Sequence, residues 1–125
     1  MSRLRRVLIV LSCAVASFSI LACKNLEEIE GLTIENIAVS VVKEGDYQGY
    51  QNYFPVTAKV LVSVRDGRIT DIKLLAHSHG PGHGADGIIE RVLEKQSLIV
   101  DAVSGATYSS KVVLKAIESA LKKGM

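Results

Sequence analysis

Cysteine is scarce in this chain, which has only Cys13 and Cys23 among its 125 residues. Cys13 lies inside an apolar run, where a thiol serves as a small apolar filler. Cys23 follows that run, so a chain cleaved after residue 22 keeps one thiol. A single thiol forms no intramolecular disulfide and builds no cysteine-based zinc or iron–sulfur site within the chain. The sequence therefore excludes a disulfide framework and leaves Cys23 for another role.

Clustered positive charge is also missing from most of the chain. The formal net charge is +2, but Arg3, Arg5 and Arg6 all stand at the N-terminus. Without them the chain has 12 basic and 13 acidic side chains, which gives a net charge of about −1. Nucleic-acid binding requires a clustered basic surface, and the pair Lys122–Lys123 only ends a helical pattern. We therefore expect no nucleic-acid partner.

The chain lacks the side-chain pairings of many enzymes. No nucleophile–base pair or pair of carboxylates stands at a spacing suited to catalysis. Internal repeats and low-complexity segments are absent as well. The 103 residues that follow residue 22 are enough for one small domain with a single core. These absences favour a small binding domain over a stand-alone enzyme.

The longest apolar run, Val7–Leu21, has 15 residues, fewer than the about 20 that a membrane-spanning helix needs. It follows the arginine-rich start and ends in Ile-Leu-Ala-Cys at residues 20–23, which has the form of a bacterial lipobox. We expect residues 1–22 to be a lipoprotein signal peptide and Cys23 to be the lipidated N-terminus. The domain would then lie in the bacterial cell envelope, outside the cytoplasm and anchored to the membrane by lipid. An uncleaved signal anchor is the alternative.

The rest of the chain predicts a tether and one folded domain. Residues 23–32 are polar and acidic and predict a short tether, followed by a domain over residues 33–125. Thr33–Val42 alternates and is rich in Ile and Val, which predicts a first strand. Lys43–Asn52 contains Gly45 and Gly49, which predicts a loop.

A hairpin is the clearest local signal. Valine and alanine alternate with other residues after Pro55, and the strand pattern resumes after Asp66-Gly67, a strong hairpin turn. Apolar residues at helical spacing follow in two later segments. The remaining expected elements are a helix over Asp86–Gln96, a short strand at Leu98–Val100 and a helix over Tyr108–Lys123. The pattern predicts an α+β fold, a small antiparallel sheet with two main helices packed on it.

All three histidines fall in one glycine-rich segment, His77–Gly84. His77 and His79 are two residues apart on a predicted strand and so share a face, and His83 could return from the turn as a third metal ligand. In a second interpretation the glycines let the backbone approach a planar ligand, while imidazole N–H groups bond to it. Solvent-exposed loop histidines without any ligand are a third interpretation.

A loop of small residues, Asp101–Thr107, opens directly into the last predicted helix. Because Ser, Gly and Ala have little bulk, a planar or phosphorylated ligand can approach this backbone closely. The unpaired N–H groups and the positive dipole end of the helix favour an anion there. The plain alternative is ordinary capping, with Thr107 or Ser109 accepting a bond from a first-turn N–H.

The order Asp-x-x-Ser-Gly-Ala-Thr resembles the flavinylation motif of the FMN-binding domain family. That family includes flavin-carrying subunits of the sodium-pumping quinone reductase and of Rnf-type electron-transfer complexes. The resemblance implies FMN as the cofactor, a phosphoester bond between FMN and Thr107, and a separate flavin transferase that recognises the motif. The residues that match the motif are Asp101, Ser104, Gly105, Ala106 and Thr107.

The segment Pro81–Gly84 resembles the Pro-Gly-x-Gly element that electron-transfer members of this family carry between a strand and a helix. The resemblance implies that this segment forms the second wall of a flavin pocket. Larger relatives usually have Glu-Thr before this element, where this chain has His79-Gly80. The flavin-contacting residues expected here are His77, His79, Gly82, His83 and Gly84.

The resemblance implies a membrane-anchored flavoprotein that acts as an electron-transfer module between a redox donor and an acceptor. Two other functions stay open at this point. One is a small flavin reductase in which a histidine protonates an external acceptor, and the other is a non-redox lipoprotein that binds a metal or another ligand. Turnover of a small acceptor by the purified domain alone would separate the reductase from the carrier.

Overall fold

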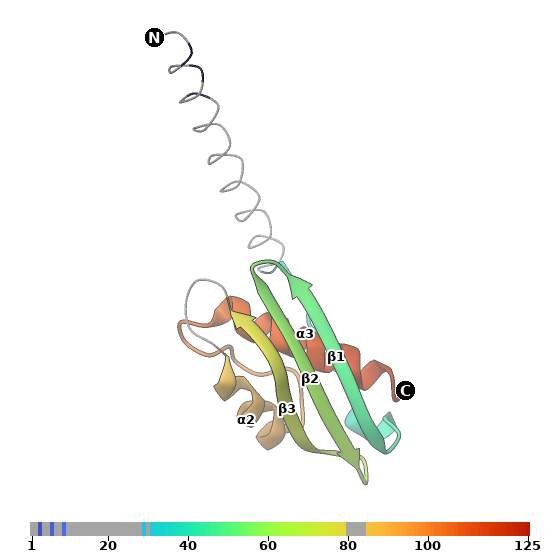
Figure 1. Ribbon diagram of the computed structural model, residues 1–125. Helices are drawn as coiled ribbons and strands as arrows, with labels where there is room; N and C mark the ends of the chain where they lie inside the picture. Colours follow the sequence, from blue (N-terminus) through green and yellow to red (C-terminus); the bar gives the residue numbers. More distant parts are fainter. Residues whose placement is uncertain (1–2, 4–5, 7–8, 10–28, 30, 80–84) are drawn as a thin grey trace.

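The computed structural model describes residues 3, 6, 9, 29, 31–79 and 85–125 (Figure 1). Its elements are η1 (Val39–Val41), β1 (Gly45–Tyr53), β2 (Val56–Arg65), β3 (Arg68–His79), α2 (Asp86–Lys95) and α3 (Thr107–Lys122). One antiparallel sheet in the order β1-β2-β3 and two helices confirm the predicted α+β fold. Cys23 and most of the expected signal peptide and tether lie outside the described residues. None of the helices described is long and apolar enough to cross a membrane.

The predicted hairpin is present as β2 and β3. Every second residue of β2 from Val56 to Val64 is fully buried, because alternate side chains of a strand point to the same face. Asp66 and Gly67 have φ of 53° and 70°, the left-handed pair that a two-residue hairpin turn requires. Arg65 and Arg68 pair directly across this turn. The hairpin prediction is therefore confirmed.

The predicted loop at Lys43–Asn52 is wrong, because most of that segment belongs to β1. This strand pairs with β2 along its whole length, from Gly45 to Tyr53. Gly49, which reads as a loop residue, is where α3 touches the sheet: a Cβ atom there would lie 1.8 Å from the carbonyl oxygen of Ala116. A glycine inside a strand often marks such a close approach of another backbone.

The predicted strands at Thr33–Val42 and Leu98–Val100 are also wrong. The first segment is irregular and ends in η1, and the second has no strand hydrogen bonds. In the second segment, side chains accept hydrogen bonds from backbone N–H groups. Asn36 Oδ1 accepts the N–H of Leu98 at 3.4 Å, and Ser97 Oγ accepts the N–H of Ile99 at 3.0 Å. Because these N–H groups are satisfied by side chains, the second segment needs no partner strand.

Both helices lie behind one face of the sheet in Figure 1, with α3 across β1 and β2 and α2 against β3. Helix α3 is antiparallel to β1: Ala116 meets Gly49, and Gly124, beyond the helix end, meets Tyr47. Thr107, at the start of α3, therefore lies toward the C-terminal end of β1. The other face of the sheet is left uncovered by the elements that the structure describes.

A buried carboxylate fastens the segment before η1 to α3. The side chain of Glu118 is 3% exposed and pairs with Lys115 and Lys122, each at 3.0 Å. It also accepts the backbone N–H of Glu35 at 3.0 Å. Lys115 donates to the carbonyl oxygen of Thr33 at 3.1 Å, and Lys122 pairs with the Glu35 carboxylate at 2.8 Å. We call these five residues the α3 clasp.

The clasp predicts a pH-dependent stability. Burial by itself raises the pKa of Glu118, but the bonds from Lys115, the Glu35 N–H and Lys122 outweigh it, so the pKa lies below its ordinary value of 4.5. The folded state therefore takes up this proton less readily than the unfolded state does. Glu118 should stabilise the fold above about pH 4.5, and this contribution should fade as the pH falls below that value.

Glu118→Gln tests this expectation by urea unfolding across pH. Near pH 7 the variant should lose about 1 to 3 kcal/mol, the usual contribution of hydrogen bonds to a charged group. The gap to the wild type should shrink in acid. Glu90→Gln, on the exposed surface of α2, is the matched control and should change stability by less than about 0.5 kcal/mol. A gap that stays constant into strong acid would contradict the role of the charge.

Candidate functional site

The small-residue loop Asp101–Thr107 contains a tight turn just before α3. The N–H of Ala106 donates to the carbonyl oxygen of Val103 at 2.9 Å. Gly105, the third residue of this turn, has a φ of 77°, as in type II turns, which favour glycine at that position. The turn delivers the chain into Thr107, the first residue of α3, whose side chain is exposed.

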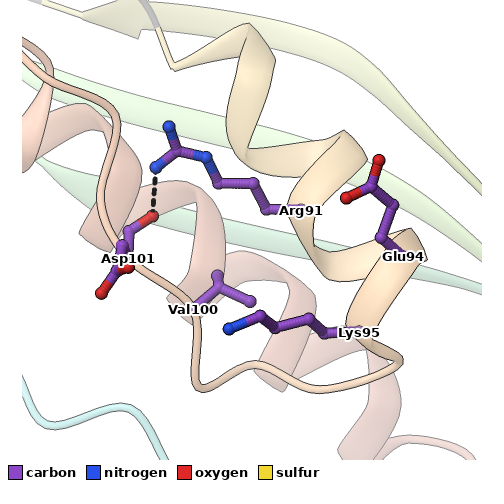
Figure 2. A pocket seen from close by; sticks show the side chains of 5 residues that line it. All are labelled: Arg91, Glu94, Lys95, Val100 and Asp101. Atoms are coloured by element: carbon purple, nitrogen blue, oxygen red, sulfur yellow. Dashed lines mark hydrogen bonds between the residues drawn. The ribbon is translucent and has the colours of Figure 1, made fainter.

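Side chains from both helices hold the loop. Arg91 of α2 donates through Nη1 to the carbonyl oxygens of Asp101 at 2.7 Å and Ala102 at 2.9 Å, and Figure 2 shows the bond to Asp101. From α3, the fully buried Ser110 accepts the N–H of Val103 through its Oγ at 3.0 Å. Because the two helices fix the loop from both sides, the turn before Thr107 is preformed.

Arg91 and Ser110 did not stand out in the sequence. Arg91 is one of several charged residues on α2, and its spacing from Asp101 follows no motif. Ser110 follows the motif by three residues and looks like a helix-surface serine, yet it is buried. The only available signal for Ser110 was its place at helical spacing between apolar residues, where a polar side chain needs a partner.

Thr107 is the first helical residue and does not cap the helix. The N-cap position belongs to Ala106, which makes no side-chain capping bond. The N–H groups of the first helical turn have no acceptor within the helix, and they combine with the positive end of the helix dipole. Lys111 stands one helical turn after Thr107. An exposed hydroxyl beside this positive helix end fits a phosphate group.

The histidine segment begins at the same end of the sheet. His77 pairs directly with Ala58, and His79 with Val56. Since directly opposite residues share a face, and Ala58 belongs to the buried face, His77 occupies a position on the helix-covered side. These β3 positions lie level with the C-terminal end of β1, because Val56 also pairs with Tyr53. The start of α3 lies toward this same end.

His77 has a defined orientation. Its Nδ1 lies 2.9 Å from the carbonyl oxygen of Thr57, and because a carbonyl only accepts, Nδ1 carries the hydrogen. The expected contact residues Gly82, His83 and Gly84 lie outside the described residues. The three-histidine metal site includes His83 and therefore also lies outside the described residues. Among the residues described, no group of three His, Cys, Asp or Glu side chains is placed to hold a metal ion.

A cavity of about 280 Å³ opens beside the first residue of the loop. Figure 2 shows its side chains coming from α2 and from the chain that leads into the loop. Four of the five lining residues are charged, whereas pockets for planar organic ligands are mostly apolar. The lining therefore does not match a flavin ring. It is formed by Arg91, Glu94, Lys95, Val100 and Asp101.

Comparison with known proteins gives one match. The model of a family described as FMN-binding domain matches residues 49–122, which run from Gly49 in β1 to the end of α3 and cover more than half of the chain. No curated protein and no solved structure matches the chain. The matched region contains the histidine segment, the loop held by Arg91 and Ser110, and the exposed hydroxyl of Thr107. With this match the expected family and cofactor are confirmed: the chain belongs to the FMN-binding domain family, and FMN is its cofactor.

Proposed function

We propose that this chain is an electron carrier of the bacterial cell envelope, anchored outside the cytoplasm through a lipid on Cys23, with FMN joined to Thr107 by a phosphoester bond. The observation that carries this proposal is the exposed Thr107 hydroxyl at the start of α3, presented by a preformed loop of small residues. The motif residues that match the family, Asp101 and Ser104–Thr107, are the residues of that loop.

The proposed bond joins Thr107 Oγ to the phosphorus of FMN. A separate transferase would hold an activated flavin nucleotide, a diphosphate of which FMN is one half. The Thr107 oxygen attacks the phosphorus on the flavin side, the P–O–P bond breaks, and the other phosphate half leaves with the hydroxyl proton. The chain therefore gains the mass of FMN less one water. Helix α3 contributes its N-terminal N–H groups to the phosphate oxygens. FMN supplies the redox chemistry when bound, and the role of the protein is to position it.

Two features favour a carrier over a stand-alone reductase. Among the residues described, the cavity near Asp101 has four charged residues out of five in its lining, more than is usual for a small-molecule site. Thr107 is exposed, so a cofactor attached there is accessible to partner proteins. We propose that a redox donor and an acceptor, which are proteins or small molecules, meet the flavin at this end of the sheet. Rapid steady-state turnover of a small acceptor by the purified protein would instead indicate a reductase.

Intact-mass measurement of the denatured protein, co-expressed with a flavin transferase, tests the proposal directly. The expected species begins at Cys23 and carries a diacylglycerol on the Cys23 thiol, commonly an acyl group on the new amino terminus, and FMN less one water. Each modification adds its own mass, so the anchor and the flavin are tested separately. A chain that begins at Met1 without acyl groups would contradict the lipid anchor. A processed chain that loses all flavin on denaturation would contradict the covalent bond.

Gly105→Val should block flavin attachment while the domain still folds. Valine at a φ of 77° is strained by about 1 to 2 kcal/mol, which distorts the turn that presents Thr107. We expect covalent flavin to fall roughly tenfold or more, since small misplacements of reacting groups are costly. Gly105→Asn is the matched control, because asparagine tolerates left-handed backbone. Loading of Gly105→Val at the wild-type level would show that the turn is not required.

The histidine segment should tune the flavin without holding it. We propose that His77, His79 and His83 border the ring, and that His79 and His83 donate N–H bonds that favour the negatively charged reduced flavin. Replacing all three by alanine should lower the midpoint potential by about 30 to 60 mV, the equivalent of one bond to a charged group. The Thr107 adduct should persist. An unchanged redox titration would place the histidines away from the ring, and zinc bound by the wild type alone would support the metal site instead.

A further inference from the structure

The face of the sheet that the helices leave uncovered carries exposed apolar side chains near one end. Phe54, in the turn between β1 and β2, is 56% exposed, and Tyr50 on β1 is also 56% exposed. Leu75 is 46% exposed and is the extra residue of the β-bulge next to Ala76. Figure 1 faces this side of the sheet, with the β1–β2 turn at its upper end.

Lysines accompany these apolar residues. Lys59 pairs directly with Tyr50 and is exposed, and Lys73 is exposed on β3 opposite Leu61. The acidic residues of this face lie further along the sheet, where Asp46 and Asp71 both pair with Ser63. The half of the face near the β1–β2 turn is therefore aromatic, apolar and basic through Lys59, and Lys73 stands at the middle of the sheet, between this half and Asp46. We call Tyr50, Phe54, Lys59, Lys73 and Leu75 the aromatic–lysine patch.

The chain enters the domain near this end. Ile29 is fully buried in the core. The segment around Thr33 and Glu35 runs parallel to α3. Thr33 contacts Lys115, and Glu35 contacts Lys122, which is closer to the C-terminal end of the helix. Ile29, four residues before Thr33, therefore lies toward the Thr107 half of α3. That half lies at the C-terminal end of β1, where the β1–β2 turn stands.

The chain between Cys23 and Ile29 is too short to let the domain turn freely. Five residues lie between Cys23 and Ile29, so Ile29 is six positions further along, and a fully extended chain covers at most about 3.6 Å per position. Cys23 therefore stays within about 20 Å of the buried Ile29. Strand β3 alone, with 12 residues, is about 40 Å long at the usual rise. A membrane that holds Cys23 must lie near the β1–β2 end of the sheet.

We infer that the aromatic–lysine patch is a membrane-contact surface that rests on anionic lipid headgroups beside the anchor. Aromatic side chains favour the interface between water and lipid, and lysines near the surface are attracted by anionic lipids. The inference rests on the proposed anchor at Cys23. The patch contacts the lipid surface, because the short connection to Cys23 brings this end of the domain to the membrane before any other part.

The absence of tryptophan from the chain allows a direct test. Phe54→Trp places the one tryptophan of the chain in the patch. Val41→Trp is the matched control, because Val41 is 59% exposed and lies at the other end of the sheet, next to Ser40, whose Cα is 3.5 Å from the Cβ position at Gly67. The full lipidated protein is reconstituted into vesicles of phosphatidylcholine and phosphatidylglycerol, with or without brominated acyl chains. Comparing the two kinds of vesicle cancels any quenching by flavin.

Brominated lipids should quench Phe54→Trp at least several-fold more than Val41→Trp. Adding Lys59→Gln and Lys73→Gln should weaken this quenching in vesicles with phosphatidylglycerol but not in pure phosphatidylcholine. Vesicle-bound protein with equal quenching at the two positions would overturn the patch and leave the anchor standing. Protein that fails to float with the vesicles would overturn the anchor and the patch together. Blue-shifted emission from the Phe54→Trp variant without lipid quenching would show that protein, not lipid, covers this face.

Discussion

Thr107→Ala is expected to give a folded protein that carries no flavin after denaturation. The methyl group of alanine cannot form a phosphoester, so the adduct of FMN less one water should disappear completely from the intact-mass spectrum. Folding should survive because the Thr107 side chain is exposed and the N-cap position belongs to Ala106. The measurement is intact mass together with circular dichroism, on protein co-expressed with the transferase.

Two variants sharpen this test. Thr107→Ser keeps a hydroxyl at the same backbone position and should retain some adduct. Thr70→Ala removes another exposed hydroxyl, on β3, which donates to the carbonyl oxygen of Ser63 at 3.2 Å. This variant should load flavin like the wild type. An adduct that persists in Thr107→Ala, or is lost equally in Thr70→Ala, would contradict the assignment of Thr107 as the flavin attachment residue.

Gly49→Ala should destabilise the domain severely. The added Cβ would lie 1.8 Å from the carbonyl oxygen of Ala116 and 2.8 Å from its carbonyl carbon. Both are backbone atoms, so no rotamer change relieves the clash and α3 must move off the sheet. We expect a loss of about 3 kcal/mol or more, the upper range for overpacked cores. A small domain has only about 5 to 15 kcal/mol of stability, so urea unfolding should show a much lower midpoint.

Gly87→Ala is the matched control for this substitution. A Cβ at Gly87 would lie 3.6 Å from Cγ2 of Val103, an ordinary contact. Gly87 lies in α2, where alanine is favoured over glycine by up to about 1 kcal/mol. The two substitutions add the same methyl group and should change stability in opposite directions. A free energy of unfolding of Gly49→Ala within about 0.5 kcal/mol of the wild type would contradict the close packing of α3 on β1.

The parts of the fold that were predictable from sequence are those with local signals. The hairpin turn Asp66-Gly67 and the alternation before it specify their own conformation, and the two helices show apolar residues at helical spacing. Strand β1 was missed because its key residue, Gly49, acts through a contact with Ala116, which is 67 positions later in the chain. Propensity describes a residue and its neighbours, whereas close approach of a distant backbone leaves no local pattern.

The same limit applies to the site. The order of small residues ending in Thr107 predicted an exposed hydroxyl at the start of a helix, and the structure places it there. The support of that loop was not predictable, because Arg91 and Ser110 bond to backbone atoms, which every residue possesses. Glu118 has lysines at the spacings of ordinary surface pairs. Its burial arises only when the segment around Glu35 crosses the helix.

The support of the loop by two helices bears on the order of folding and flavin attachment. Arg91 and Ser110 stand on different helices, so the loop shape exists only after the domain has folded. An unfolded chain has the same sequence but does not present the same loop surface. If loading requires this shape, cofactor attachment follows folding. Attachment then acts as a selection step, in which misfolded copies stay without flavin.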